Sequence, residues 1–324
     1  MPSGYARVAR SRHALRQNGP MTQILELAND HWQVGLLPST GGSVAYGRVN
    51  IGGTWHDVMR PTPAGSLTSV PDTASYPLVP WSNRIAGGKL RWAGKTYQLR
   101  VNHSDGTAIH GTASEYPWTV AESSLTHAVL EFASRDVYGV NFPWTFTARF
   151  TYRLDGDRFT WTYGITNSDH ETFPAGFGHH PYFERSVAGS RTAHLQLNVE
   201  QAYDAEECIP FGEAGAIRPD ADFRAAREIG GAFVDDCYTA RTSPTLATVT
   251  WPGVLELDVE ADDLLSHAVV YIPEGKPFFA LEPVSNANDA FNLAERGIHS
   301  ANLLLVQPGQ TVQASFSLIA KPLA

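Results

Sequence analysis

Residues 145–166 read TFTARFTYRLDGDRFTWTYGIT, and the pattern of this stretch indicates the fold class. In its first half the apolar side chains occupy every second position, namely Phe146, Ala148, Phe150, Tyr152 and Leu154. In its second half they alternate again, at Phe159, Trp161, Tyr163 and Ile165. A period of two is typical of a strand with one buried face, and the intervening Asp155-Gly156-Asp157 is a turn sequence. The stretch therefore predicts an antiparallel β-hairpin.

The same alternation returns at 195–199, 255–259 and 312–318. Helical patterning is scarce, and the best helix candidate is the short segment 222–229. Twenty-eight glycines and 21 prolines separate many short segments, as a sandwich or barrel of strands requires. Because no linker, low-complexity tract or internal repeat divides the chain, we expect one domain over 21–324. The predicted class is all-β, a large antiparallel β-sandwich with little helix.

Composition limits the kinds of partner that the protein can have. The chain has 324 residues, 43% of them hydrophobic, and a formal net charge of −9 from 24 basic and 33 acidic residues. An acidic body argues against nucleic acid and against anionic membrane as partners. The longest aliphatic run, residues 303–306, is far too short to span a membrane. Cys208 and Cys237 cannot form a disulfide framework, so we expect a reducing, cytoplasmic location and thiols that are structural or incidental.

The first twenty residues differ from the rest of the chain. They hold four arginines and no acid, which leaves 20 basic and 33 acidic residues, or −13, for the remainder. Without an apolar core this leader is not a secretory signal. It is interpreted as a disordered basic extension, with a transit peptide as the alternative; Met21 is a plausible start of translation.

Sequence patterns for metal and nucleophile chemistry are missing. Twelve histidines occur without H-E-x-x-H or H-x-H spacing, and there is no C-x-x-C pair. His179 and His180 are adjacent, so in a strand their side chains point to opposite faces and would not chelate one ion. Gly-x-Ser-x-Gly is also absent. We therefore expect no metal site.

Polar residues in turn-rich or apolar surroundings are the candidates for chemistry. They are Asn83 and Arg84 in PWSNRIAGG, His110 in IHG, His180 in GFGHHPYF, Asp235 in FVDDCY and Glu282 in FFALEP. Glu282 is the most informative, because a carboxylate that follows four apolar residues is expected to be desolvated. Desolvation raises its pKa toward that of a useful general base.

These motifs, in this order from about residue 25 to residue 318, resemble those of the aldose 1-epimerases, or galactose mutarotases. The residues of the segments 80–85 and 178–183 are similar to those of the broader bacterial branch of that family. In the galactose-dedicated branch an Asn precedes the second histidine, whereas this chain has His179. The resemblance implies a galactose mutarotase-like sandwich that binds a monosaccharide and needs no cofactor. We expect a monomer or a homodimer.

The resemblance also implies a role for each candidate. Glu282 would take the proton of the C1 hydroxyl while His180 protonates the ring oxygen, the two lying on opposite sides of the hemiacetal. His110 would assist at the ring oxygen or bind a hydroxyl, and Asp235, Asn83 and Arg84 would bind the other hydroxyls. Asp235 is preferred to Asp236 because it stands three residues before Tyr238, as the motif requires.

Three alternatives stay open on the sequence alone. The same fold can serve a non-catalytic sugar sensor, and Asp235 with Glu282 would suit a glycoside hydrolase or lyase. A hexose 6-phosphate is also possible as the substrate, although only four of the 24 basic residues are lysines and no basic cluster adjoins the motifs. Trp81 and Trp144 flank turn or loop segments and could stack on a sugar, while Trp161 falls in the apolar row of the hairpin and is expected in the core.

Overall fold

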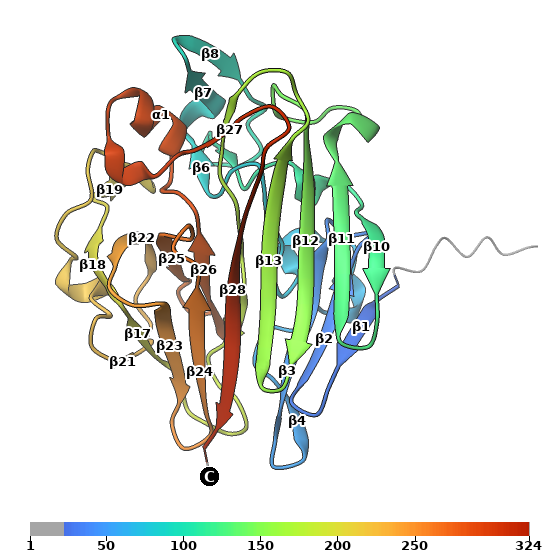
Figure 1. The fold of residues 1–324 in the computed structure, drawn as a ribbon. Helices are drawn as coiled ribbons and strands as arrows, with labels where there is room; N and C mark the ends of the chain where they lie inside the picture. Colours follow the sequence, from blue (N-terminus) through green and yellow to red (C-terminus); the bar gives the residue numbers. More distant parts are fainter. Residues whose placement is uncertain (1–22, 324) are drawn as a thin grey trace, which may run out of the picture.

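The computed structural model describes residues 23–323, a part of the chain that antiparallel strands dominate (Figure 1). The predicted hairpin is present as β12 (Phe146–Asp155) and β13 (Arg158–Asn167). Asp155 pairs with Arg158 across a two-residue turn in which Gly156 has a φ of 57°. Glycine suits that position because it adopts positive φ without steric cost. The apolar rows of both strands are buried, as the alternation predicted.

This hairpin lies inside the larger of two main sheets (Figure 1). Its nine strands, in spatial order, are β10 (Thr119–Ser123), β11 (His127–Ala133), β12, β13, β28 (Thr311–Pro322), β24 (Leu255–Ala261), β23 (Thr245–Trp251), β17 (His194–Leu197) and β21 (Arg227–Glu228). The predicted strands at 255–259 and 312–318 are thereby confirmed as β24 and β28.

The second main sheet carries the predicted site residues Asp235 and Glu282. Its strands run in the order β18 (Val199–Ala202), β22 (Val234–Arg241), β25 (His267–Ile272), β26 (Phe278–Val284), β15 (Gly178–His179) and β5 (Pro77–Leu78), and β16 (Tyr182–Glu184) also pairs with β26. The predicted strand at 195–199 is divided between the sheets, because β17 ends at Leu197 and β18 begins at Val199.

The two main sheets pack face to face and enclose an aromatic core. The His179 ring of β15 stacks on Trp161 of β13 with centroids 5.6 Å apart, and it also contacts Phe150 and Tyr163. Trp161 is fully buried, so its expected place in the core is confirmed. An all-β sandwich of antiparallel sheets is therefore the observed architecture, as predicted.

Smaller sheets and one helix complete the described part. The sheets comprise β1 (Leu25–Ala28), β2 (Trp32–Leu37), β3 (Ser43–Ile51) and β4 (Thr54–Asp57); β14 (Phe173–Ala175) and β27 (Leu304–Val306); β19 (Ala205–Glu206) and β20 (Ile209–Pro210); β6 (Arg84–Ile85) and β9 (Ala108–Ile109); and β7 (Lys89–Trp92) and β8 (Lys95–Gln98). Helix α1 spans Ala290–Glu295. Within residues 23–323 no helix has the length and apolarity needed to cross a membrane.

The helix predicted over 222–229 is wrong. The Asp222 carboxylate accepts hydrogen bonds from the Arg224 backbone N–H and from its guanidinium, an arrangement that competes with helical hydrogen bonding. Arg227 and Glu228 then join the edge of the nine-stranded sheet as β21. The basic leader 1–20 lies outside the described residues.

Candidate active site

A cavity of about 640 Å³ opens beside the seven-stranded sheet. All six residues predicted for the site line it, namely Asn83, Arg84, His110, His180, Asp235 and Glu282. They come from distant parts of the chain: Arg84 from β6, Asp235 from β22 and Glu282 from β26, while His110 and His180 directly follow β9 and β15. The seven-stranded sheet and the β6–β9 pair together therefore gather the predicted residues around one concave space.

Glu282 and His180 contact each other within this cavity. Glu282 Oε1 lies 3.1 Å from His180 Nε2, and the two residues are only 1% and 5% exposed. The His180 ring is held between the rings of Tyr76 and Tyr182, with centroid distances of 4.9 and 4.4 Å. The other polar atom of each residue, His180 Nδ1 and Glu282 Oε2, has no hydrogen-bond partner within the described chain. The pair is thus fixed in orientation and still has free hydrogen-bonding capacity.

Burial moves the two pKa values in opposite directions, because it disfavours the charged form of either group. It lowers the pKa of His180 to about 3 and raises the pKa of Glu282 well above its usual range, with a further increase from Asp235. The pair therefore favours holding one proton at neutral pH. Both pKa shifts place that proton on Glu282, beside a neutral imidazole, and its transfer across the 3.1 Å contact gives the tautomer with a carboxylate base and an imidazolium acid.

This direct contact differs from the expectation that the acid and base lie on opposite sides of the hemiacetal. The side chains converge on one place instead of facing each other across a substrate. Such an arrangement suits a hemiacetal, because its hydroxyl oxygen and its ring oxygen are bonded to the same carbon. A base and an acid side by side can reach both oxygens at once.

His110 forms another wall of the cavity. Its ring lies edge-on to the His180 ring, with centroids 5.2 Å apart, and its Nδ1 has no partner within the described residues. Burial lowers its pKa well below the usual range, so the ring is neutral at pH 7. Gly111 has a φ of 73°, and a Cβ there would lie 2.1 Å from the Val79 carbonyl oxygen, so the position accepts only glycine. The close approach of this glycine to Val79 fixes where His110 stands.

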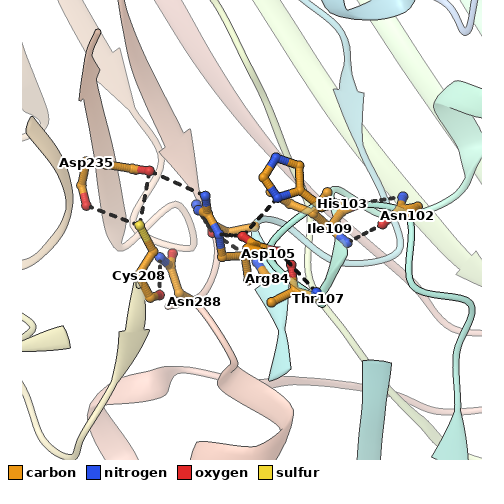
Figure 2. Close-up of polar contacts among 10 residues, drawn as sticks. Arg84, Asn102, His103, Asp105, Thr107, Ile109, Cys208, Asp235 and Asn288 are labelled. Carbon is orange, nitrogen blue, oxygen red and sulfur yellow. Dashed lines mark hydrogen bonds and ion pairs between the residues drawn. The ribbon is translucent and has the colours of Figure 1, made fainter. Parts of the chain in front are cut away.

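Arg84 is held between two carboxylates (Figure 2). Its Nη2 lies 3.5 Å from Asp235 Oδ2, and its Nε donates to Asp105 Oδ2 at 2.9 Å. His103 Nδ1 is also 2.9 Å from Asp105 Oδ2. Asn83 Oδ1 accepts from the Arg84 backbone N–H and from its Nη1, so Asn83 orients Arg84 with its oxygen. The predicted hydroxyl-binding residues therefore form one connected group.

Asp105, His103, Tyr76 and Tyr182 were not predicted as site residues. Although burial opposes it, hydrogen bonds from Thr107, Arg84 and His103 lower the pKa of Asp105, so this carboxylate stays ionised beside Arg84. The only sequence signal was the polar run at 102–105, which is also what an ordinary loop looks like. Nothing local distinguishes the two interpretations, since the contact with Arg84 joins separate parts of the chain.

The structure separates both pairs of adjacent candidates. His179 points into the core, where Ser75 Oγ contacts its Nδ1 and Tyr152 Oη lies 3.2 Å from its Nε2. Asp236 does not line the cavity of His180 and Glu282; its Oδ2 accepts from Arg218 Nε at 2.8 Å. In each pair the residue preferred from the motif is the one that lines the cavity.

Sugar stacking by tryptophan is not supported by the cavity lining. Trp81 is fully buried and Trp144 is 5% exposed, and neither lines the cavity. Both pack around Phe142, at centroid distances of 6.1 and 5.2 Å, in the hydrophobic core. Neither ring is therefore placed to stack on a sugar bound in this cavity.

Comparisons with known proteins bear on the family and the fold of this chain. The sequence matches the aldose 1-epimerase family over residues 38–318. Two uncharacterized proteins of Escherichia coli K12 are similar: YihR at 27% identity over 245 residues (74% of this chain, 77% of YihR) and YphB at 26% over 286 residues (83% and 91%).

Solved structures share the architecture. A candidate aldose 1-epimerase from Escherichia coli K12 matches with a TM-score of 0.80 at 22% identity, over 93% of this chain and 99% of that one. A galactose mutarotase-like protein from Clostridium acetobutylicum matches with a TM-score of 0.78 at 16% identity, over 93% and 95%. The fold is thus that of the galactose mutarotase-like proteins, and the family match over most of the sequence shows that this chain belongs to the aldose 1-epimerase family.

Proposed function

We propose that the protein is an aldose 1-epimerase that interconverts the α and β anomers of an unphosphorylated aldose. The observation that carries this proposal is the buried contact between Glu282 and His180 at 3.1 Å in the cavity. A protein that only binds sugar needs hydroxyl partners, and it has no need of a desolvated acid–base pair that shares one proton. General acid and base groups in such positions contribute roughly 10²–10⁴-fold each.

The reaction follows from the two groups in contact. The Glu282 carboxylate takes the proton of the C1 hydroxyl as that oxygen becomes a carbonyl. The bond between C1 and the ring oxygen breaks, and the ring oxygen takes the proton of the His180 imidazolium. After rotation about C1–C2, the hydroxyl formed from the ring oxygen adds to the other face of the C1 carbonyl. As it adds, it returns its proton to His180, and Glu282 returns to the C1 oxygen the proton that it took in the first step.

The remaining residues bind and orient the sugar. The neutral His110 ring, edge-on to His180, can hydrogen-bond the ring oxygen or a neighbouring hydroxyl through its unpartnered Nδ1. Asp235 accepts from hydroxyls, and Arg84, aligned by Asn83 and Asp105, donates to them. A substrate positioned in this way presents its C1 to the acid–base pair.

The charges around the cavity favour a neutral sugar over a sugar phosphate. Arg84 lines the cavity, and Asp105 and Asp235 already occupy two sides of its guanidinium. Arg60 lies behind Tyr182, with its guanidinium 3.8 Å from the ring centroid, and donates to the carbonyl oxygens of Pro71 and Thr73. A phosphate would need an arginine whose guanidinium is open to it, and would lie close to Glu282 and Asp235.

Anomer exchange measured by saturation-transfer NMR tests the proposal. The purified protein is added to equilibrated glucose, galactose, a pentose and glucose 6-phosphate, and Glu282→Gln serves as the inactive control. We expect faster exchange for at least one unphosphorylated aldose, and loss of that acceleration in the variant.

Other outcomes would contradict specific parts of the proposal. Line broadening of a sugar without faster exchange would show a binding protein instead of an enzyme. Exchange restricted to glucose 6-phosphate would overturn the preference for a neutral sugar. Glycoside cleavage in a parallel product analysis would indicate a hydrolase, with Asp235 and Glu282 as the carboxylate pair.

A further inference from the structure

Cys208 lies in a two-residue hairpin turn next to Asp235. Strands β19 and β20 pair Glu206 with Ile209, so Glu207 and Cys208 form the turn between them. Both turn residues have positive φ, 47° and 63°. Such turns favour Asn-Gly, because the Cβ of a non-glycine residue is crowded in the left-handed region. This backbone therefore persists against its own local preference.

One backbone contact and one side-chain contact hold Cys208 in place (Figure 2). Its carbonyl oxygen accepts from Asn288 Nδ2 at 2.9 Å, and Asn288 is 2% exposed. Its Sγ lies 3.1 Å from Asp235 Oδ2. The strained turn thus presents the thiol to the one carboxylate of β22 that lines the cavity.

The thiol acts as a donor in this contact. Burial, reinforced by the negative charge of Asp235, raises the pKa of Cys208 to about 12. At neutral pH the sulfur therefore keeps its proton, and the Asp235 carboxylate accepts a hydrogen bond from the S–H group. A protonated thiol of this kind is a poor nucleophile and resists oxidation, which argues against a redox role.

Two donors meet on the same oxygen of Asp235. Cys208 Sγ and Arg84 Nη2 both approach Oδ2, at 3.1 and 3.5 Å, whereas no described residue hydrogen-bonds Oδ1. A carboxylate held at one oxygen has the other one free to accept from a ligand. We propose that Cys208 is a positioning residue, whose S–H fixes Asp235 so that Oδ1 receives a sugar hydroxyl. This inference rests on the proposed function for the identity of the ligand.

Kinetics of Cys208 variants test the positioning role. We expect Cys208→Ala to raise KM roughly 5- to 20-fold, with kcat changed less than about twofold, because a lost hydrogen bond to a charged group affects binding. Cys208→Ser keeps a donor and should recover most of the loss. Cys237→Ala is the matched control, since this buried thiol makes no hydrogen bond to the Asp235 side chain in the described chain, and its KM should equal that of the wild type. A wild-type KM in Cys208→Ala would overturn the role.

An infrared measurement tests the contact without any turnover. In a Cys237→Ala background the S–H stretching band reports Cys208 alone, because the chain has only two cysteines. Adding Asp235→Asn should move that band to higher frequency, since an amide oxygen is a weaker acceptor than a carboxylate. An unchanged band would overturn the inference even if every Cys208 variant failed to fold. A wild-type protein that exchanges no sugar would instead contradict the proposed function, a result that leaves the band shift intact as support for the contact.

Discussion

His179 and His180 are neighbours in the chain, yet they belong to two different regions of the molecule. Both are buried, and burial lowers the pKa of both. On the core side, His179 has a hydroxyl partner at each ring nitrogen and stacks on Trp161. On the cavity side, His180 contacts a carboxyl group through one nitrogen and leaves the other free. Burial alone therefore does not mark a reactive group; a partner that exchanges protons and an open cavity do.

The acidic neighbours Asp235 and Asp236 show the same contrast as the two histidines. Asp235 faces the cavity and approaches Arg84, whereas Asp236 faces the other way and pairs with Arg218. Strand alternation explains both cases, because successive side chains of a strand point to opposite faces. Matched substitutions of adjacent residues can therefore separate function from stability.

The largest expected effect is on kcat, when each of the two adjacent histidines is replaced by asparagine. His180→Asn removes the proposed proton donor to the ring oxygen, so we expect kcat to fall roughly 10²–10⁴-fold. His179→Asn leaves the cavity intact, so kcat should stay within about threefold of the wild type. Anomer exchange by saturation-transfer NMR measures both variants. Equal losses in the two would break the distinction between cavity and core.

Asparagine at the two aspartates should change affinity by a smaller factor. Asp235→Asn removes a charged acceptor of sugar hydroxyls and a partner of Arg84, which we expect to raise KM roughly 10- to 100-fold. Asp236→Asn affects only the pair with Arg218 and should leave KM unchanged. Initial rates of anomer exchange over a range of sugar concentration give both values. A raised KM in Asp236→Asn alone would reverse the assignment.

Substitution of the core residue His179 should lower the stability of the protein without lowering its activity to the same extent. His179→Asn removes the ring that stacks on Trp161 and cannot reach both Ser75 and Tyr152, although the Tyr152 hydroxyl still donates to the Gly42 carbonyl oxygen. Lost ring packing and a lost buried hydrogen bond both lower stability, and we expect the free energy of unfolding at pH 7.5 to fall by about 1–3 kcal/mol. Urea denaturation followed by tryptophan fluorescence measures it. A variant as stable as the wild type would show that neither the ring packing nor the hydroxyl contacts of His179 stabilise the fold.

The pH dependence of stability should have opposite signs at Glu282 and at His179. The pKa of Glu282 is raised in the folded state, so its stabilising proton is fully present below the unfolded pKa and lost as pH rises. The stability of the wild type relative to Glu282→Gln should therefore fall between pH 5 and pH 8, by up to about 1.4 kcal/mol per pH unit.

The pKa of His179 is lowered in the folded state, so below about pH 6.5 the unfolded chain binds the extra proton. The stability of the wild type relative to His179→Asn should therefore rise between pH 5 and pH 6.5. Denaturation curves at several pH values test both slopes. Two slopes of the same sign would contradict the idea that burial lowers one pKa and raises the other.

Local patterns predicted the parts of the fold that depend on neighbouring residues. The β12–β13 hairpin follows from alternation and from a turn at Gly156, both contained in one short stretch. The helix expected over 222–229 failed for the converse reason, because the edge of a sheet and the Asp222 side chain offered the backbone other hydrogen bonds. Pairing with distant strands is invisible in a local pattern.

By itself, the sequence determined the fold class, the identity of the six polar residues that line the cavity, and which member of each adjacent pair faces it. Strand alternation is a property of short segments, and the resemblance of the motifs to those of the aldose 1-epimerases selected one member of each adjacent pair. Only the tertiary structure decided that Glu282 touches His180, that Asp105 holds Arg84, and that Cys208 reaches Asp235. These contacts join residues far apart in the chain. They exist because the sheets and the β19–β20 turn bring the side chains together, and burial there sets their proton affinities.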